Sequence, residues 1–413
     1  CDGLDNDCDG SVDEGCTTGS TDLVGTDMND TFYDVASDGN GHLYVVGATY
    51  GDIGMHTNQG GTDIVVAKYD TQGNRLWLNV FGSSSHEKGR AVAVGENGSI
   101  YVTGTTDGEL GTRSNAGHHD VFLTKYKPDG TREWLDMIGT QGVDRGRDLA
   151  AAPGGGVYVS GHIGDSIDGR QHMGRWDAFL ARYKADGTRD WTRLLGSPDA
   201  DEARGVAVDK NSGTVVIAGQ ARGSMANKPH AGGSDLFAAA FSETGQRLWV
   251  RMEGTTSSSG SGSDAGLDAG GDIDSGGTSS TGDFDVVSAV TIDSNGTVYL
   301  AGRTLGNLGG ETNSGGSDGC MLAYDLQGNQ KWVQLIGTPE DDRLTAVDVM
   351  SNGNLRVAGM THGDFGMSQN IGHYDLFAAE VDTAGQSQSF GMVGSPDRDK
   401  LNGWVETEQG EAF

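Results

Sequence analysis

The amino-acid sequence predicts an all-β fold, a β-propeller of four-stranded antiparallel blades. Two observations predict it: a unit of about 57 residues recurs along the chain, and each copy holds four strand-like segments without a helical period. Tryptophans mark the repeat at intervals of 57, 57, 58 and 83 residues, at Trp77, Trp134, Trp191, Trp249 and Trp332. An aspartate fourteen residues earlier follows the same intervals, at Asp63, Asp120, Asp177, Asp235 and Asp318, and a sixth copy follows at Asp375. Glycines form a third repeated column, at Gly47, Gly104, Gly161, Gly219, Gly302 and Gly359.

The four strands of a unit are clearest in the second copy. Residues 90–94 (RAVAV) and 99–104 (SIYVTG) are joined by GENG, a hairpin-turn composition. Residues 121–127 (VFLTKYK) and 132–139 (REWLDMIG) are joined in the same way by PDGT. A β-solenoid is the alternative, but its coils usually need only about 20–30 residues each, so the length of the unit favours the propeller.

The two ends of the chain predict a seventh blade. First strands are expected near seven positions: Val35, Val92, Leu149, Val206, Val290, Val347 and Val405. Residues 21–26 (TDLVGT) resemble a fourth strand without the three that should precede it, and residues 400–413 supply a first strand. A seventh blade closed by both termini would remove open sheet edges. No third strand for it is visible in the sequence.

Two segments are expected to differ from the repeats. Residues 1–19 form an acidic, cysteine-containing segment ahead of a propeller predicted over 20–413. Residues 255–283 are Ser, Gly and Asp-rich and are interpreted as an exposed loop within the fifth unit. Asp264, Asp268 and Asp272 in that loop are weaker candidates for cation binding.

Composition limits the function classes. The formal net charge is −31, with only 28 Lys and Arg, and no basic cluster suited to phosphates is evident along the sequence. The charge therefore argues against nucleic acid or another polyanion as the partner. No stretch approaches the roughly 18 apolar residues of a membrane span.

The opening segment CDGLDNDCDGSVDEGC is a candidate calcium site. Asp5, Asp7, Asp9 and Gly10 form D-x-D-x-D-G, the first half of an EF-hand-type loop, in which alternating carboxylates converge on one ion. The expected ligands are Asp5, Asp7, Asp9, the Ser11 carbonyl, Asp13 and Glu14. Cys16 stands where such a loop usually has a bidentate Glu. Oxygen ligands favour Ca²⁺ over zinc or copper, and the ion's role would be structural.

The four cysteines suggest an oxidising compartment. Cys1, Cys8 and Cys16 are candidates for disulfides, and their pairing stays open. A zinc site is the alternative, although no histidine lies nearby to complete a usual ligand set. Cys320 falls in an expected third strand and is interpreted as a buried apolar residue.

The repeat resembles the SBBP-type bacterial β-propeller repeats, on NQGGTDIVVAKYDTQGNRLW (58–77) followed by GRAVAVGENGSIYVTGTTDG (89–108). The opening segment resembles a metal-binding motif of exported proteins common in myxobacteria. The resemblances imply a seven-bladed fold, an exported bacterial context and a divalent cation. They imply no particular activity.

No catalytic residue is predicted. The repeated Asp63, Asp120, Asp177, Asp235, Asp318 and Asp375 are interpreted as structural, because a catalytic group would be confined to one or two blades. A minor metal-binding role for them stays open. Five loop histidines could together ring one face and bind a metal, or simply fill polar loops: His118, His119, His172, His230 and His373. The Trp residues are expected to pack between blades rather than to form a sugar platform.

The function expected from the sequence is a non-enzymatic structural or binding protein outside the cell or on its outer surface. It would be stabilised by calcium and would self-associate into a filament or surface layer, through the N-terminal segment or a donated strand. The alternatives are an adhesin or lectin-like propeller that binds glycan or protein, and a polysaccharide lyase or hydrolase. The enzyme would need carboxylates or histidines that occur in one blade only and converge on the axis.

Overall fold

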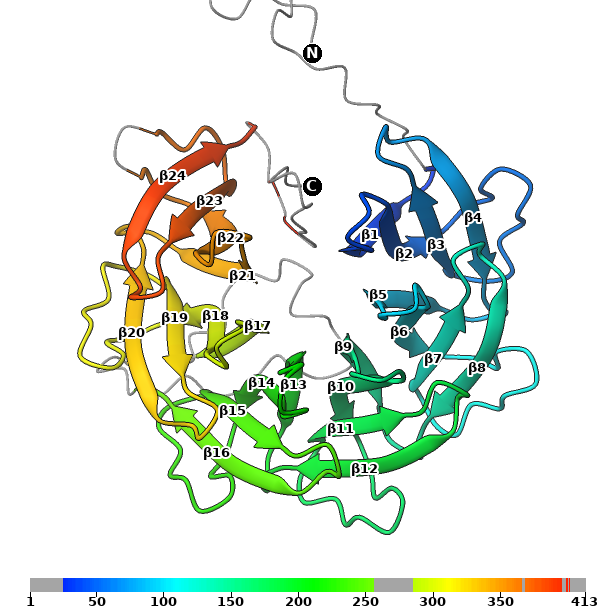
Figure 1. The fold of residues 1–413 in the computed structure, drawn as a ribbon, viewed down its shortest axis with the longest axis horizontal. Coiled ribbons are helices and arrows are strands. Elements are labelled where there is room, and N and C mark those ends of the chain that lie inside the picture. The colour runs from blue at the N-terminus through cyan, green and yellow to red at the C-terminus, as the bar shows by residue number, and fades with distance from the viewer. Residues whose placement is uncertain (1–24, 256–284, 366–367, 396–398, 400, 402–413) are drawn as a thin grey trace, which may run out of the picture.

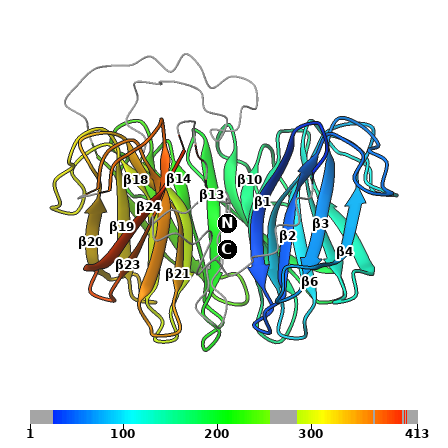
Figure 2. The same ribbon diagram turned by 90° about the horizontal axis from the view of Figure 1, so that it is seen from above.

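Six four-stranded antiparallel sheets stand around a common axis (Figure 1) in the computed structural model. It describes residues 25–255, 285–365, 368–395, 399 and 401. Within each sheet the strands pair in sequence order, so the first strand lies innermost and the fourth outermost. Figure 2 shows that the strands run along the axis. The predicted β-propeller of repeated four-stranded blades is confirmed.

The first three blades have strands of seven or eight residues. Blade one consists of β1 (Asp30–Ser37), β2 (Leu43–Thr49), β3 (Asp63–Tyr69) and β4 (Arg75–Phe81). Blade two consists of β5 (Glu87–Val94), β6 (Ile100–Thr106), β7 (Asp120–Tyr126) and β8 (Arg132–Ile138). Blade three consists of β9 (Arg145–Ala151), β10 (Val157–Ile163), β11 (Asp177–Tyr183) and β12 (Arg189–Leu195).

The other three blades repeat this arrangement. Blade four consists of β13 (Asp201–Val208), β14 (Val215–Ala221), β15 (Asp235–Phe241) and β16 (Arg247–Glu253). Blade five consists of β17 (Val286–Ile292), β18 (Val298–Thr304), β19 (Asp318–Tyr324) and β20 (Gln330–Ile336). Blade six consists of β21 (Asp342–Val349), β22 (Leu355–Thr361), β23 (Asp375–Val381) and β24 (Ser387–Val393).

The hydrophobic core lies between blades. Each of the five clusters of buried apolar side chains in the described chain joins the facing sides of two consecutive blades. The side chains alternate along each strand, so one set packs against the preceding blade and the other against the following one. Cys320, in β19, is fully buried in the cluster between blades four and five, as expected, and burial raises the pKa of its thiol.

The repeated tryptophans join neighbouring blades. Trp134 stacks on Tyr183 of the next blade, with ring centroids 6.2 Å apart and planes inclined by 16°. Its Nε1 also donates to the Ala185 carbonyl at 3.1 Å. Gly187 lies against the same indole, since a Cβ there would come within 2.8 Å of it. The predicted packing of these tryptophans between blades is confirmed.

A β-bulge interrupts the inner strand of every blade and explains the glycine column. In blade two the pairing of β5 with β6 shifts between Gly89 and Ala91, which leaves Arg90 as the extra residue. A Cβ on Gly104, opposite the bulge, would lie 1.9 Å from the Lys88 carbonyl oxygen. Only glycine therefore permits this approach, and the bulge turns the extra residue out of the regular alternation.

A carboxylate at the start of an inner strand marks each junction between blades. In blade two, Glu87 accepts hydrogen bonds from the backbone N–H (2.6 Å) and hydroxyl (2.6 Å) of Ser83. Its own N–H donates to the Thr62 carbonyl of blade one at 2.9 Å. Equivalent carboxylates cap the preceding loops of blades three to six: Asp144, Asp201, Asp285 and Asp342.

The predicted number of blades is corrected from seven to six in the described chain. Nearly all of the residues expected to build a seventh blade, 21–26 and 400–413, lie outside it. Asp399, after blade six, makes the same kind of cap: it accepts from the N–H and Oγ of Ser395 at 2.8 and 3.1 Å. The Asp399 N–H donates to the Tyr374 carbonyl at 2.9 Å, as the strand-start carboxylates of other blades do.

The sheet faces beside this position are less covered than their counterparts. Leu43 and Val45 of blade one are partly exposed, whereas the equivalent Ile100 and Val102 of blade two are fully buried. On the opposite side, Leu376 of blade six is partly exposed and Val393 at the end of β24 is 70% exposed. Figure 1 shows these two blades at the ends of the arc of six.

Candidate functional site

One layer of residues around the axis differs most between blades. In each blade it contains the residue that follows the strand-start carboxylate, the partner of that residue on the second strand, and the bulged residue two positions further along the inner strand. The six pairs are Thr31–Ala48, Lys88–Thr105, Arg145–His162, Glu202–Gln220, Val286–Arg303 and Arg343–Met360. The six bulged residues are Tyr33, Arg90, Arg147, Arg204, Ser288 and Thr345. We call these eighteen residues the axial layer.

Basic side chains are concentrated in the axial layer. Seven of the chain's 28 Lys and Arg residues lie in it: Lys88, Arg90, Arg145, Arg147, Arg204, Arg303 and Arg343. The layer contains a single carboxylate, Glu202. In a chain of net charge −31, the axial layer is therefore a local region of positive charge.

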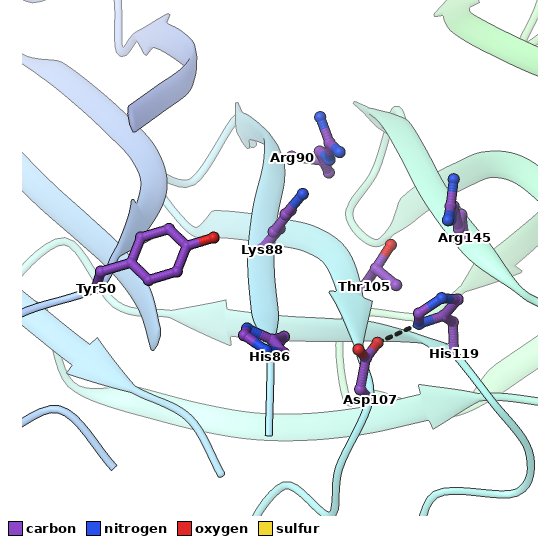
Figure 3. A pocket seen from close by; sticks show the side chains of 8 residues that line it. All are labelled: Tyr50, His86, Lys88, Arg90, Thr105, Asp107, His119 and Arg145. Carbon is purple, nitrogen blue, oxygen red and sulfur yellow. Dashed lines mark hydrogen bonds and ion pairs between the residues drawn. The ribbon is translucent and has the colours of Figure 1, made fainter. Parts of the chain in front are cut away.

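A pocket of about 270 Å³ opens beside the axial layer between blades one, two and three (Figure 3). Lys88 and Arg90 come from β5 and Arg145 from β9. The other lining side chains are polar or aromatic: Tyr50, His86, Thr105, Asp107 and His119. Three cations against one carboxylate make the pocket suited to an oxyanion, which guanidinium groups bind through paired N–H donors.

Three residue pairs shape the wall of this pocket. His119 Nδ1 hydrogen-bonds Oδ1 of Asp107, which orients the imidazole toward the pocket interior (Figure 3). Tyr50 is 43% exposed and its ring meets the His86 ring edge-on, with centroids 6.4 Å apart. The Arg90 guanidinium lies over the Tyr33 ring at 4.4 Å, a cation–π contact between two bulged residues. The pocket thus combines an exposed aromatic face with fixed hydrogen-bonding groups.

Glu202 neutralises the adjoining part of the axial layer. Its carboxylate accepts from Arg147 Nε at 2.6 Å, Arg204 Nε at 3.0 Å and His162 Nδ1 at 3.0 Å. Burial alone would raise the pKa of this carboxyl, but the two guanidiniums and the histidine hold it well below its usual value. Burial lowers the pKa of His162, so the imidazole is neutral beside the two arginines. The preceding blade has Arg145 at the position of Glu202, and its pocket is correspondingly basic.

The repeated aspartates hold the loop before each third strand. In each blade one carboxylate oxygen accepts the backbone N–H four residues earlier, as Asp120 does from Ala116 at 2.7 Å. The carboxyl also abuts the glycine after the fourth strand, since a Cβ on Gly139 would lie 2.2 Å from Asp120. Burial, followed by the charge of Asp144, raises the pKa of Asp120 to about 6. The other members make the same contact: Asp63, Asp177, Asp235, Asp318 and Asp375.

The metal sites expected from the sequence fall in two groups. The calcium ligands Asp5, Asp7, Asp9, Ser11, Asp13 and Glu14, and the cysteines Cys1, Cys8 and Cys16, lie outside the described residues. Among the residues that are described, no three His, Cys, Asp or Glu side chains converge as metal ligands would. The loop histidines are not brought together: His172 and His230 each face the repeated aspartate of their own blade, at 3.8 Å.

The axial layer was missed in the sequence because it is built from positions that do not repeat. Comparison of the repeats identifies residues that all blades share, whereas the basic residues differ from blade to blade. The available signal is the four-residue run that begins at the strand-start carboxylate in four of the blades: EKGR (87–90), DRGR (144–147), DEAR (201–204) and DRLT (342–345). No basic cluster suited to phosphates is present along the sequence, whereas the fold brings basic residues from separate repeats into one layer.

No family model matches the chain, so the resemblance to SBBP-type repeats stays a prediction. The chain is 24% identical to the regulatory protein FlaEY of Caulobacter vibrioides over 363 residues, which cover 80% of this chain and 36% of that protein. It is 26% identical to a WD repeat-containing protein, L264, of Acanthamoeba polyphaga mimivirus over 169 residues, covering 34% and 12% of the two chains.

The chain therefore spans about a third or less of the length of these two relatives. Among solved structures, it is similar to a polysaccharide lyase of family PL25, an ulvan lyase, with a TM-score of 0.46 and 12% identity over 89% of this chain and 86% of that one. A YCF48 structure with a bound D1 peptide gives a TM-score of 0.42 at 11% identity, over 89% and 82% of the chains. No helix in the described residues is long and apolar enough to cross a membrane.

Proposed function

We propose that this propeller is a non-enzymatic binding protein that takes an acidic glycan of the cell exterior at the pocket beside its axial layer. One observation supports the proposal above all: seven basic residues from five blades gather in one layer of a chain whose net charge is −31. Such a concentration of like charge is unfavourable unless the site is occupied by negative charge. Three of them, Lys88, Arg90 and Arg145, line the pocket.

The pocket favours a glycan over other anionic ligands for two reasons. Tyr50 offers a half-exposed aromatic face, and Thr105, Asp107 and the histidines offer fixed hydrogen-bonding groups, the combination that a sugar ring requires. A nucleic acid would run beyond the pocket over the acidic remainder of the surface, where net repulsion opposes it. A glycan with carboxylate or sulfate groups can present its charge locally.

Calorimetry with a matched pair of ligands tests this proposal. Tri-galacturonate, with a carboxylate on each ring, is compared with neutral maltotriose and with an acidic Glu-rich peptide. Binding of the galacturonate alone supports the proposal. Tighter binding of the peptide would instead identify a protein partner, and no binding of either anion would contradict an anionic ligand.

An enzyme acting on the same class of ligand is the second candidate. The pocket contains His119 oriented by Asp107, a pair that only one of the six described blades has, and the lyase alternative requires such a blade-specific group. The absorbance of the same mixtures at 235 nm is therefore recorded, because a lyase would release unsaturated sugar products. If the wild type releases such products and His119→Gln binds the ligand without releasing them, the protein is a lyase and not a non-enzymatic binding protein.

The remaining expectations from the sequence form part of the proposal. Location outside the cell and calcium binding by residues 1–19 both rest on the composition of that segment. A seventh blade that uses residues 21–26 and 400–413 is supported by the carboxylate cap at Asp399 and by the matching cap of Asp30 on Thr26 Oγ at 2.9 Å. The partly exposed faces of blades one and six flank this place.

Self-assembly through a donated strand is tested by light scattering. We expect association to depend on concentration, because the faces of blades one and six would be covered by strands of a second copy. Addition of a calcium chelator separates assembly through the acidic segment from assembly through strands. A monomer at all concentrations, with and without chelator, would rule out both routes.

A further inference from the structure

Lys68 is a buried cation without an acidic partner in the described chain. It lies on β3 and is 7% exposed. No hydrogen bond or ion pair joins its Nζ to a residue that the structure describes. The ammonium lies 5.1 Å from the centre of the Tyr44 ring, and this cation–π contact replaces only part of the hydration that a buried charge loses.

The equivalent cations of blades two and three do have carboxylate partners. Lys125 and Arg182 occupy the position of Lys68, since each of the three is paired across its sheet with the repeated tryptophan. Lys125 Nζ lies 2.8 Å from Glu133 Oε2. Arg182 Nη1 lies 3.4 Å from Asp190 Oδ2. In both blades the carboxylate immediately precedes the tryptophan on the fourth strand, so the cation is neutralised within its own sheet.

Blade one lacks this carboxylate. Leu76 precedes the repeated tryptophan on β4, at the position of Glu133, and is 51% exposed. An apolar side chain cannot accept a hydrogen bond, so Lys68 lacks the acceptor that Lys125 has, although the two lysines are equally buried, at 7% and 6% exposed.

Lys68 lines a pocket of about 760 Å³. The pocket lies among the turns that follow the first strands of blades one to four. These turns stand at the opposite end of the strands from the loops that carry Tyr50 and Asp107, so this pocket is separate from the basic pocket of Figure 3. Part of its wall is apolar, from Val94, Pro128, Ala151 and Pro153.

The charged groups of this pocket favour a ligand with one carboxylate. Asp38 lines the pocket, but its carboxylate already accepts from the backbone N–H and Nδ1 of His42 at 3.2 and 2.8 Å. Glu96 and Lys210 complete the charged lining. Because two carboxylates accompany the two lysines, a ligand with many negative charges is repelled, whereas a single carboxylate can pair with Lys68.

We infer that this pocket binds an acidic peptide segment of a partner protein, with one Asp or Glu carboxylate on Lys68 and apolar neighbours against the wall that contains Pro128 and Pro153. The ligand carboxylate takes the place that Glu133 has beside Lys125. A peptide fits this wall better than a sugar acid does, because apolar side chains flank its carboxylate where a sugar has hydroxyl groups. The site is additional to the glycan pocket and does not depend on it.

Calorimetry with a matched pair of peptides tests the inference on the full chain. The probes are the capped tripeptides Leu-Glu-Leu and Leu-Gln-Leu, which differ in one charge. Loss of a charge-assisted hydrogen bond weakens binding by about 10- to 100-fold, so wild type should prefer the Glu peptide by that factor. Lys68→Gln should abolish the preference, and Lys125→Gln should retain it. Equal affinities of wild type for the two peptides, or no binding of either, would overturn the inference.

Leu76→Glu tests the same site with Lys68 in place. The introduced carboxylate should pair with Lys68 as Glu133 does with Lys125, which raises the melting temperature and abolishes the preference for the Glu peptide. A Leu76→Glu protein that keeps the preference would show that the peptide carboxylate does not bind at Lys68. Tri-galacturonate should bind Lys68→Gln as it binds wild type; a weaker affinity would show that sugar acids occupy this pocket and would overturn the peptide as its ligand.

Discussion

Arg147 Nε donates to Glu202 Oε1 at 2.6 Å, across the junction between blades three and four. Arg147 is the extra residue of a β-bulge, and Glu202 is the second residue of the next inner strand. In the preceding junction the equivalent residues are Arg90 and Arg145, which line one pocket. The β-bulge of the inner strand thus places opposite charges together in one junction and like charges in the junction before it. The basic pocket results from the like charges.

Replacing Glu202 by Gln should destabilise the protein and strengthen anion binding at the same time. Arg147 and Arg204 would lose their shared carboxylate, and breaking a buried ion pair costs about 3–5 kcal/mol. Urea denaturation measures the loss. The control is Glu243→Gln, because Glu243 pairs with Arg182 at 2.6 Å with its side chain 56% exposed. The control should change stability by less than about 1 kcal/mol, and equal losses in both variants would contradict the account.

Gly104→Ala tests the explanation of the glycine column. A Cβ at this position would lie 1.9 Å from the Lys88 carbonyl, so the bulge must open or the strands must separate. We expect the free energy of unfolding to fall by about 3 kcal/mol or more. Gly391→Ala, where a Cβ meets nothing within 4 Å, should change it by no more than about 0.5 kcal/mol. A stable Gly104→Ala protein with unaltered ligand affinity would refute the role assigned to the bulge.

Stability should fall as the pH rises toward 8. Burial raises the pKa of Asp34 to about 8, although its carboxylate accepts the Val92 N–H at 2.8 Å. A folded-state pKa above the unfolded value of 3.8 means that the protonated form stabilises the fold. This contribution is fully present below pH 4 and is lost as the pH rises through 8.

Asp34→Asn should therefore flatten the dependence of unfolding free energy on pH between 6 and 8, by up to about 1.4 kcal/mol per pH unit. Asp129→Asn is the control, because Asp129 is an exposed turn residue whose pKa is lowered, chiefly by its hydrogen bonds from Thr131. The control should keep the wild-type slope. An unchanged slope in Asp34→Asn would show that Asp34 does not carry a proton in this range.

Calcium should bind through the N-terminal segment. In Asp5→Asn and Asp9→Asn, each of which removes one carboxylate of the alternating set, we expect roughly tenfold or greater loss of calcium affinity. Calorimetric titration of calcium into chelator-treated protein provides the measurement. Replacement of Asp264 in the low-complexity segment serves as the control and should leave the affinity unchanged. Calcium binding that survives both N-terminal substitutions would place the ion elsewhere.

Repeated features of the fold were accessible from the sequence. The intervals between Trp77, Trp134 and Trp191 predict the blades, and hairpin turns such as GENG predict the strand order. These predictions are correct because every blade packs against its neighbour through the same positions. The role of Gly104 was not accessible, because the bulge depends on cross-strand register rather than on composition.

The candidate site was not accessible for the same reason. Lys88, Arg145 and Arg303 occupy related places only after the strands are paired, and Arg303 comes from a second strand rather than a first one. The net charge was misleading, because a total of −31 does not show that the basic residues are concentrated in one layer of the fold. Likewise, no sequence feature indicated that Asp399 caps the preceding loop as the strand-start carboxylates do.

The dissociation constant of tri-galacturonate for Arg90→Gln, relative to wild type and to Arg247→Gln, tests the central claim most directly. Arg90 lines the pocket, whereas Arg247 is exposed on β16 far from it. Loss of one charge-assisted hydrogen bond is worth about 1.5–3 kcal/mol, so Arg90→Gln should weaken binding by about 10- to 100-fold. Arg247→Gln should bind as wild type does. Equal affinities of all three proteins would contradict an anion site beside the axial layer.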